Sequence, residues 1–314
     1  MKKIIPFICQ VDITIQENWL NVLKKELTNY EVILHTKLTN EQLFECEVAI
    51  VANPHPEVFS KMPKLKWVQS LWAGVERLLL EVPASKFEIV RMADLSLANT
   101  MAQSVLAWTF YLYKNMPLYQ KQQSQKVWKE HILEQPEDKN IVILGLGNLG
   151  KKSALKLLEN DFNVFGWSRS KKEIEGIKTY CGNDGLEQVL KIADIVVCLL
   201  PLTKETTNLI DSSKLKLLKK GSSIINFARE PIIDYDALVK SIQDSHISHA
   251  VLDVFKEEPL NENSALWDNP NITILPHISA PTNMKTAAKL AASNISDYFY
   301  SGKLPTFVDK KSGY

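Results

Sequence analysis

The chain has 314 residues, of which 45% are hydrophobic and 23% are charged, and its formal net charge is +1 at pH 7. A chain of this length can bury the cores of two domains. Its near-zero charge gives no electrostatic reason to expect nucleic acid or an anionic membrane as a partner. The longest apolar stretch, Val105 to Tyr113, is too short to cross a bilayer.

The cysteines and the N-terminal residues indicate the compartment. The four cysteines, none in a CxxC pair, are Cys9, Cys46, Cys181 and Cys198. Cys9 and Cys198 fall in apolar runs, which favours buried, reduced thiols. His246 and His249 lie three residues apart, but nothing nearby completes a metal site, so none is predicted and both are interpreted as surface or strand histidines. A short apolar run without a small-residue cleavage site follows Met1-Lys2-Lys3, so we expect no signal peptide and a cytoplasmic location.

Residues 1 to about 99 alternate between strand-like and helix-like segments. Apolar runs predict strands at Ile4–Cys9, Tyr30–His35, Val48–Ala52, Leu65–Gln69 and Phe87–Met92. Between the first two, the apolar residues from Trp19 to Leu27 have helical spacing. This alternation is typical of a parallel sheet covered on both faces. No glycine-rich phosphate loop follows the first strand, so we do not expect this half to hold a dinucleotide.

A long helical pattern separates the two halves. It runs from Asn99 to about Leu133 and is broken near Met116-Pro117, because proline removes a hydrogen-bond donor and clashes with the preceding turn. We interpret it as a domain connector or a subunit interface. A second alternation begins at Asn140. Its predicted strands continue at Asn163–Trp167, Ile195–Leu200, Ser223–Phe227, Ala250–Leu252 and Ile272–Leu275, with helices near Leu215–Leu218, Tyr235–Ile242 and Met284–Tyr300.

The most informative motif is Gly145-Leu146-Gly147-Asn148-Leu149-Gly150. A buried-strand pattern precedes it, and the apolar residues from Ala154 to Leu158 give it a helix on the other side. Gly145 permits a tight turn, Gly147 lets the backbone approach a pyrophosphate, and Gly150 allows the helix to pack closely on the strand. The helix N-terminus offers free N–H groups to phosphates. In this context the motif predicts a dinucleotide site.

The end of the next strand favours NADP(H) over NAD(H). NAD-binding domains of this kind place an acidic residue there, which binds the ribose hydroxyls. Here the strand ends in Ser168-Arg169-Ser170-Lys171-Lys172, without a carboxylate. Hydroxyl, guanidinium and ammonium groups suit a 2′-phosphate. We expect Ser168, Arg169 and Ser170 to bind the cofactor, with Arg169 stacked on the adenine and in contact with the 2′-phosphate. The alternative is a solvated basic turn.

Three later segments place chargeable side chains at the ends of strand-like runs. They are Ile225–Arg229, Leu252–Leu260 and Ile274–His277. Ligands bind beyond the carboxyl ends of parallel strands, so these groups can converge near the nicotinamide. With the glycine loop, this order of motifs resembles the D-isomer-specific 2-hydroxyacid dehydrogenases over nearly the whole chain. The resemblance is closest to their glyoxylate/hydroxypyruvate reductase A branch.

The resemblance implies an α/β fold with two doubly wound parallel-sheet domains. Residues 1–99 and 284–314 would form a flavodoxin-like substrate domain. Residues 100–283 would form a Rossmann dinucleotide-binding domain with the connecting helix. The implied activity is hydride transfer from NADPH to a small 2-oxo acid, such as glyoxylate or hydroxypyruvate, which gives a D-2-hydroxy acid.

The catalytic residues implied by the resemblance are Arg229, Glu258 and His277. His277 would donate a proton to the carbonyl oxygen, because imidazole can load and release a proton near neutral pH. Glu258 would hydrogen-bond the other ring nitrogen and stabilise the imidazolium. Arg229 would bind the substrate carboxylate and polarise the carbonyl. Taken singly, each has a plainer interpretation: a histidine that caps a turn, a solvated glutamate, or an arginine paired on the surface.

The resemblance also implies contacts to the cofactor and substrate. Asp253 would orient the nicotinamide carboxamide, and Leu200 and Pro201 match the segment that lines the cofactor cleft. The substrate loop would be Gln69–Glu76, in which backbone N–H groups hold the substrate carboxylate. Its expected contacts are Trp72, Ala73, Gly74 and Val75. Trp72 would narrow the pocket, which favours short 2-oxo acids; the alternative is a core tryptophan beside a turn.

Similarity to the family's connecting helix, at Asn99–Trp108, and to its dimer-forming arm, at Gln120–Trp128, implies a homodimer. Alternatively, the aromatic residues of these helices pack within one subunit.

Two residues depart from the family pattern. Glu230 follows the arginine where relatives usually have glycine, and Gln103 replaces a common acid. Glu230 gives some support to a second hypothesis, a dinucleotide-sensing binding protein with little turnover. The basic turn argues against an NAD-dependent D-lactate or phosphoglycerate type of enzyme.

Overall fold

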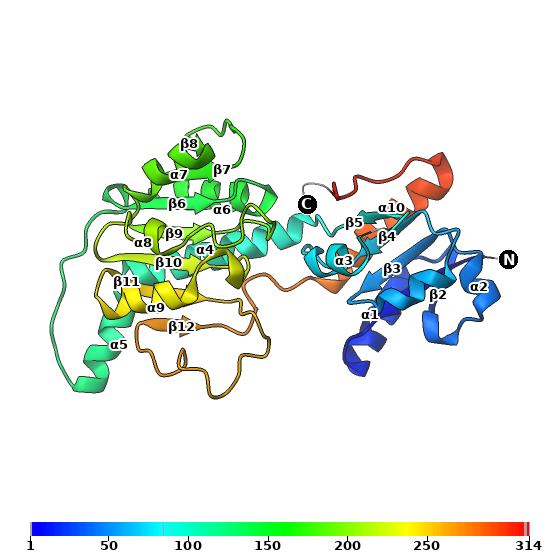
Figure 1. Cartoon of the computed structure of the whole chain (residues 1–314), viewed down its shortest axis with the longest axis horizontal. Coiled ribbons are helices and arrows are strands. Elements are labelled where there is room, and N and C mark those ends of the chain that lie inside the picture. Colours follow the sequence, from blue (N-terminus) through cyan, green and yellow to red (C-terminus); the bar gives the residue numbers. More distant parts are fainter. Residues whose placement is uncertain (1, 84, 311–312, 314) are drawn as a thin grey trace. The chain divides into compact units, whose positions relative to one another are not determined.

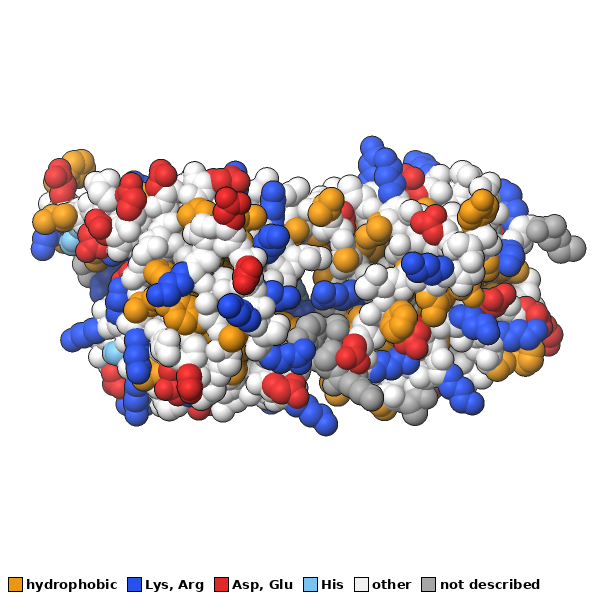
Figure 2. All heavy atoms as spheres, turned by 90° about the horizontal axis from the view of Figure 1, so that it is seen from above, with side chains coloured by type: hydrophobic (Ala, Val, Ile, Leu, Met, Phe, Trp, Pro, Cys, Tyr) orange, Lys and Arg blue, Asp and Glu red, His pale blue; other side chains and the backbone are white. Residues whose placement is uncertain are grey.

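Two units form the computed structural model, Met1–Ser96 with Thr282–Tyr314 and Leu97–Pro281 (Figure 1). The structure describes residues 2–83, 85–310 and 313. No helix in these described ranges is long and apolar enough to cross a membrane. Acidic and basic side chains are interspersed on the face of the molecule in Figure 2, in keeping with the small net charge.

A parallel sheet with the strand order β2-β1-β3-β4-β5 forms the centre of the first unit. Its strands are β1 (Lys3–Cys9), β2 (Tyr30–Leu34), β3 (Val48–Ala52), β4 (Trp67–Ser70) and β5 (Glu88–Val90). Its helices are α1 (Ile13–Glu26), α2 (Asn40–Phe44), α3 (Glu76–Glu81) and α10 (Met284–Ser301). This strand order is that of flavodoxin-like doubly wound sheets.

The first unit has apolar cores on both faces of its sheet. Alternate residues of β3 point to opposite faces, so Ile50 packs in the cluster that contains Trp19 of α1 and Ala291 of α10. Val51 packs in the other cluster, with Leu78 of α3. The two covered faces explain why β3 is an uninterrupted apolar run. The carboxyl-terminal helix α10 therefore completes the core of the amino-terminal unit.

A parallel sheet with the strand order β12-β11-β10-β9-β6-β7-β8 forms the centre of the second unit. Its strands are β6 (Asn140–Leu144), β7 (Asn163–Ser168), β8 (Lys178–Cys181), β9 (Ile195–Cys198), β10 (Ser222–Asn226), β11 (Ile247–Leu252) and β12 (Ile272–Ile274). Its helices are α4 (Leu95–Tyr113), α5 (Met116–Gln125), α6 (Asn148–Leu158), α7 (Gly182–Leu190), α8 (Ser212–Leu215) and α9 (Tyr235–Gln243). Strand order reverses between β6 and β9, as in Rossmann domains. The predicted fold class is confirmed.

Helix α5 and strand β8 are among the elements that differ from the sequence prediction. The helical pattern expected to reach Leu133 ends at Gln125, because Lys126 adopts a left-handed conformation (φ 57°) and its N–H bonds back to the carbonyls of Gln122 and Gln123. The segment that follows is folded by side-chain hydrogen bonds, such as Gln122 Nε2 to the Lys129 carbonyl (3.2 Å). Strand β8 was not predicted, since it is a short, partly exposed edge strand with little apolar sequence.

The four cysteines are free thiols. Cys198, at the end of β9, is buried as predicted, and burial raises its pKa to about 12. Cys9 is only partly buried, and burial raises its pKa to about 11. Both thiols therefore stay protonated near neutral pH and are poor nucleophiles.

Candidate active site

The predicted residues of the second unit follow one row of paired residues across its sheet. The row is Trp167, Leu144, Cys198, Asn226, Leu252 and Ile274, from β7 to β12. Parallel strands present their carboxyl ends at the same edge, so residues just beyond this row share that edge. Those residues are Ser168, Gly145, Leu200, Arg229, Asp253 and His277. With about 4.8 Å between strands, the row extends over roughly 24 Å.

The glycine motif forms the turn from β6 into α6. Gly145 has φ +103°, and a Cβ there would lie 2.7 Å from the Leu199 carbonyl oxygen. A Cβ on Gly150 would lie only 1.7 Å from the Gly145 carbonyl oxygen, so close packing of helix on strand requires both glycines. Gly147 differs, since no described atom lies within 4 Å of the place where its Cβ would stand. The open space lies at the N-terminus of an 11-residue helix, and this fits a pyrophosphate group.

The basic turn and the loop after β9 lie near each other. Arg169 and Ser170 are exposed, whereas Ser168 is buried and its hydroxyl donates to the Ser170 carbonyl (2.8 Å). The pKa of Glu205, in the loop after β9, is lowered mainly by its hydrogen bond with Thr203 and further by the positive charge of Arg169. The guanidinium of Arg169 is therefore within electrostatic reach of that loop.

Thr206 keeps the loop after β9 in one conformation. Its hydroxyl donates to the carbonyl of Pro201 (2.7 Å) and accepts from the N–H of Thr203 (2.8 Å). Leu199 extends the strand by donating its N–H to the Leu144 carbonyl (2.8 Å), and Leu200 is buried. The predicted cofactor segment Leu200-Pro201 thus stands directly beside the glycine turn.

His277 and Glu258 are in direct contact. His277 Nδ1 lies 2.8 Å from Glu258 Oε2, and the second carboxylate oxygen accepts the backbone N–H of Phe255 (2.9 Å). A carboxylate accepts from Nδ1–H, which leaves Nε2 directed away from the pair. The His277 side chain is 49% exposed, so the imidazole is accessible from solvent. His277 also has a left-handed backbone, with φ 54°.

Asp253 holds the backbone that follows His277. It is fully buried; Oδ1 accepts from the N–H of Ile278 (2.7 Å), and Oδ2 accepts from the N–H (2.9 Å) and the hydroxyl of Ser279. The sequence predicted a contact between Asp253 and the nicotinamide carboxamide, which stays a prediction. The contacts of its two oxygens show that it fixes the segment carrying His277.

Arg229 follows β10 and precedes a short 3-10 turn, Glu230–Ile232. Its backbone carbonyl accepts from the buried Asn226 amide (3.2 Å), which also donates to the Tyr235 hydroxyl (3.0 Å). The hydroxyl of Tyr235 in turn donates to the Val254 carbonyl (3.1 Å), and burial raises the Tyr235 pKa well above its usual value. This buried pair joins the Arg229 turn to the start of the Glu258 segment. Sequence reasoning missed it, although a polar residue ending an apolar strand was a usable signal.

The predicted substrate loop belongs to the first unit and follows β4. The Ser70 hydroxyl accepts the Trp72 N–H (3.0 Å), and the Trp72 indole donates to Asn53 Oδ1 (3.1 Å). Trp72 also packs edge-on against Trp19, with the ring centroids 6.0 Å apart. It is only partly buried, and with Gly74 and Val75 it borders a small pocket. Ala73 lies between them and is also partly exposed.

Known proteins resemble this chain over most of its length. The D-isomer specific 2-hydroxyacid dehydrogenase NAD binding domain matches residues 106–279. The glyoxylate/hydroxypyruvate reductase A of Yersinia enterocolitica serotype O:8 / biotype 1B is 33% identical over 276 residues, 85% of this chain and 88% of that protein. The protein of the same name from Photorhabdus laumondii subsp. laumondii is 32% identical over 307 residues, 94% of this chain and 96% of that one.

Solved structures match the whole fold. A D-isomer specific 2-hydroxyacid dehydrogenase from Xanthobacter autotrophicus Py2, in complex with NADPH and MES, has a TM-score of 0.93 and 30% identity over 100% of both chains. The NADPH-dependent glyoxylate/hydroxypyruvate reductase of Sinorhizobium meliloti, in complex with NADP and sulfate, has a TM-score of 0.91 and 29% identity, again over 100% of both. The chain therefore belongs to the D-isomer specific 2-hydroxyacid dehydrogenase family and is an NAD(P)-dependent dehydrogenase.

Proposed function

We propose that this enzyme reduces a small 2-oxo acid, such as glyoxylate or hydroxypyruvate, to the D-2-hydroxy acid with NADPH. The observation that carries the proposal is the 2.8 Å contact between His277 and Glu258 at the same sheet edge as the glycine turn. Relatives named glyoxylate/hydroxypyruvate reductase A support the substrate class.

The catalytic residues divide the reaction between them. When bound, the coenzyme supplies the hydride that reduces the carbonyl carbon. His277 donates the proton on Nε2 to the carbonyl oxygen, so the oxo group becomes a hydroxyl. Glu258 holds Nδ1 and thereby fixes which ring nitrogen faces the substrate. Arg229 binds the carboxylate of the 2-oxo acid through its forked donors and polarises the carbonyl.

In this proposal the loop after β4 binds the substrate. Backbone N–H groups of Ala73, Gly74 and Val75 hold the substrate carboxylate, because small residues let a ligand approach the backbone. Trp72 restricts the length of the 2-oxo acid, and its hydrogen bond to Asn53 and its contact with Trp19 support this role by fixing the indole.

The preference for NADPH rests on the turn after β7. Ser168, Arg169 and Ser170 offer hydroxyls and a guanidinium without a carboxylate, and a 2′-phosphate is bound by such groups. Related structures contain NADPH or NADP. A comparison of kcat/KM with the two coenzymes tests the preference. We expect NADPH to be favoured, and a clear preference for NADH would overturn it.

A homodimer would use α5 and the segment after it as the interface. Trp128 is 98% exposed and Ile132 is 95% exposed in the single chain, and aromatic side chains are enriched in interface cores. Other exposed apolar residues of this stretch are Met116, Leu118, Tyr119, Val127 and Leu133. Trp128→Ser should shift sedimentation toward monomer, whereas Tyr300→Ser, at an exposed aromatic residue outside this stretch, should not. A monomeric wild-type protein would refute the dimer.

The activity itself is tested by following NADPH absorbance with glyoxylate, hydroxypyruvate, pyruvate and phenylpyruvate. We expect turnover of the short acids that His277→Ala abolishes without loss of NADPH binding. Tight NADPH binding with no turnover of any acid would instead favour a dinucleotide-sensing protein.

A further inference from the structure

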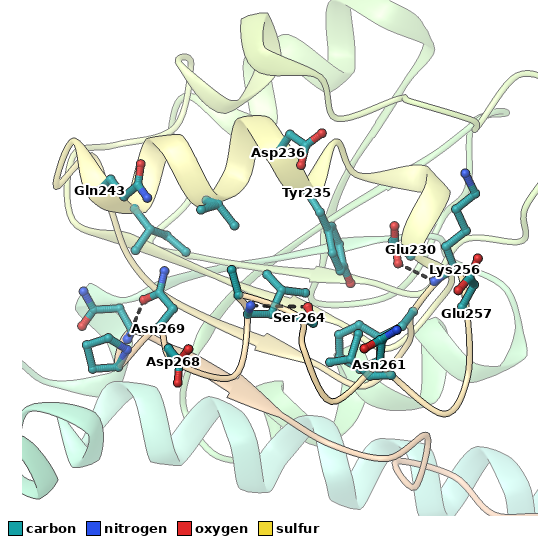
Figure 3. A pocket seen from close by; sticks show the side chains of 18 of the residues that line it. Glu230, Tyr235, Asp236, Gln243, Lys256, Glu257, Asn261, Ser264, Asp268 and Asn269 are labelled. Atoms are coloured by element: carbon teal, nitrogen blue, oxygen red, sulfur yellow. Dashed lines mark hydrogen bonds between the residues drawn. The ribbon is translucent and has the colours of Figure 1, made fainter.

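The carboxylate of Glu230 holds the segment that carries Glu258. One of its oxygens, Oε2, accepts a hydrogen bond from the backbone N–H of Lys256 (Figure 3). Glu230 begins the short turn after Arg229, and Lys256 lies two residues before Glu258. The contact therefore joins the turn of one catalytic residue to the segment of another.

Three successive residues of this segment form backbone hydrogen bonds with different side chains. The Val254 carbonyl accepts from Tyr235, the Phe255 N–H donates to Glu258 itself, and the Lys256 N–H donates to Glu230. The Tyr235 contact is buried, whereas Lys256 is exposed. The hydrogen bond from the Lys256 N–H to Glu230 therefore holds an exposed residue of the segment, two positions before Glu258.

Glu230 and Lys256 stand at one end of an open groove between α9 and residues 255–271 (Figure 3). Without the carboxylate, the Lys256 N–H would face water in this groove and the segment would gain freedom. Because the Phe255 amide bonds to the Glu258 carboxylate, movement of this segment would carry Glu258 away from His277.

We propose that Glu230 is a positioning residue, which keeps the Glu258 carboxylate directed at His277 by holding the Lys256 amide. The catalytic part of this inference rests on the proposed function. It also explains the presence of an acid next to Arg229, because a carboxylate engaged by the Lys256 amide does not compete with the substrate for the guanidinium.

The contact is tested first without substrate, by amide hydrogen exchange of a peptide that spans residues 254–258. Glu230→Ala removes the acceptor, and we expect the Lys256 amide to exchange at least about tenfold faster, since hydrogen bonds to charged groups protect strongly. Glu230→Gln retains an acceptor oxygen and should keep most of the protection. Glu257→Ala, at an exposed acid on the same groove, is the control and should exchange as the wild type does. Unchanged exchange in Glu230→Ala would overturn the proposal.

Steady-state kinetics test the positioning role. In Glu230→Ala we expect kcat to fall about tenfold, while the KM of the 2-oxo acid and the Kd of NADPH change less than about twofold. Glu230→Gln should recover most of kcat. A tenfold rise in KM at unchanged kcat would overturn the proposal, because Glu230 would then act on substrate binding. If the wild type reduces no 2-oxo acid but the exchange result holds, the proposed function fails and the contact stands.

Discussion

Two of the motif glycines, Gly150 and Gly147, predict opposite mutational outcomes. In Gly150→Ala, the new methyl carbon would start 1.7 Å from the Gly145 carbonyl oxygen, whereas ordinary contact begins near 3.4 Å. Helix α6 would have to move away from β6 by more than a bond length. Overpacking usually costs about 1–3 kcal/mol, and this backbone contact should cost at least about 3 kcal/mol of unfolding free energy.

In Gly147→Ala, the backbone conformation (φ −74°, ψ −167°) is open to alanine, and the methyl group meets no described atom within 4 Å. Alanine lowers the conformational entropy of the unfolded chain, which stabilises the fold, but it is a poorer N-cap residue than glycine, which destabilises it. Because the two effects oppose each other, the unfolding free energy should change by less than about 1 kcal/mol. The methyl group would, however, occupy the space expected for the pyrophosphate. Displacing the pyrophosphate would cost at least one charge-assisted hydrogen bond to the backbone. This loss raises the Kd of NADPH by about 10- to 100-fold.

The assay pairs urea unfolding, followed by circular dichroism, with titration of NADPH fluorescence. Gly150→Ala should lose stability, and Gly147→Ala should lose affinity at wild-type stability. A Gly147→Ala variant that binds NADPH as tightly as the wild type would show that the pyrophosphate lies elsewhere. A fully stable Gly150→Ala would contradict the close packing of α6 on β6.

Three further predictions concern single side chains. His249 is 4% exposed, and burial lowers its pKa from 6.5 to about 4. The imidazole therefore binds a proton more readily in the unfolded chain than in the folded protein. The unfolding free energy should fall by about 2 kcal/mol as the pH drops from 7.5 to 5. His249→Val should remove this pH dependence, which His55→Gln should leave intact. Arg169→Ala should raise the KM of NADPH about tenfold more than that of NADH, because only NADPH carries the 2′-phosphate; equal effects on both would refute the phosphate contact. Asp253→Asn sets an NH₂ group against the N–H groups of Ile278 and Ser279 and should lower kcat at least about tenfold, an effect that Asp236→Asn, at an exposed position of α9, should not reproduce.

The sequence predicted those parts of the fold that depend on local pattern. The apolar run Ile141–Leu144 and the glycines after it define strand, turn and helix within a dozen residues, so their arrangement could be inferred without the tertiary structure. The strand order was implied by family resemblance, and site residues could be named at the ends of six strands of the second unit. Each of those residues lies just beyond the paired row at one sheet edge.

The features that the sequence did not predict depend on contacts between distant residues. Helix α5 ends at Gln125 because Lys126 takes a left-handed conformation that its residue type does not favour. His249 looked like a surface or strand histidine, and only the covering of β11 buries it. The link between Asn226 and Tyr235 joins an end of β10 to the start of α9. A polar residue at the end of an apolar strand, such as Asn226, signals a buried hydrogen bond, but the sequence alone does not identify the distant partner.

Two carboxylates from the segment after β11 control the conformation of His277 in complementary ways. Asp253 binds the next two backbone N–H groups, and Glu258 binds the imidazole Nδ1. A left-handed conformation at a non-glycine residue costs about 1–2 kcal/mol, and the hydrogen bonds to a fully buried carboxylate can offset that cost. The backbone and the ring of His277 are thus fixed separately, by residues five positions apart. In the proposed mechanism, these contacts preorganise His277 to present Nε2 to a substrate.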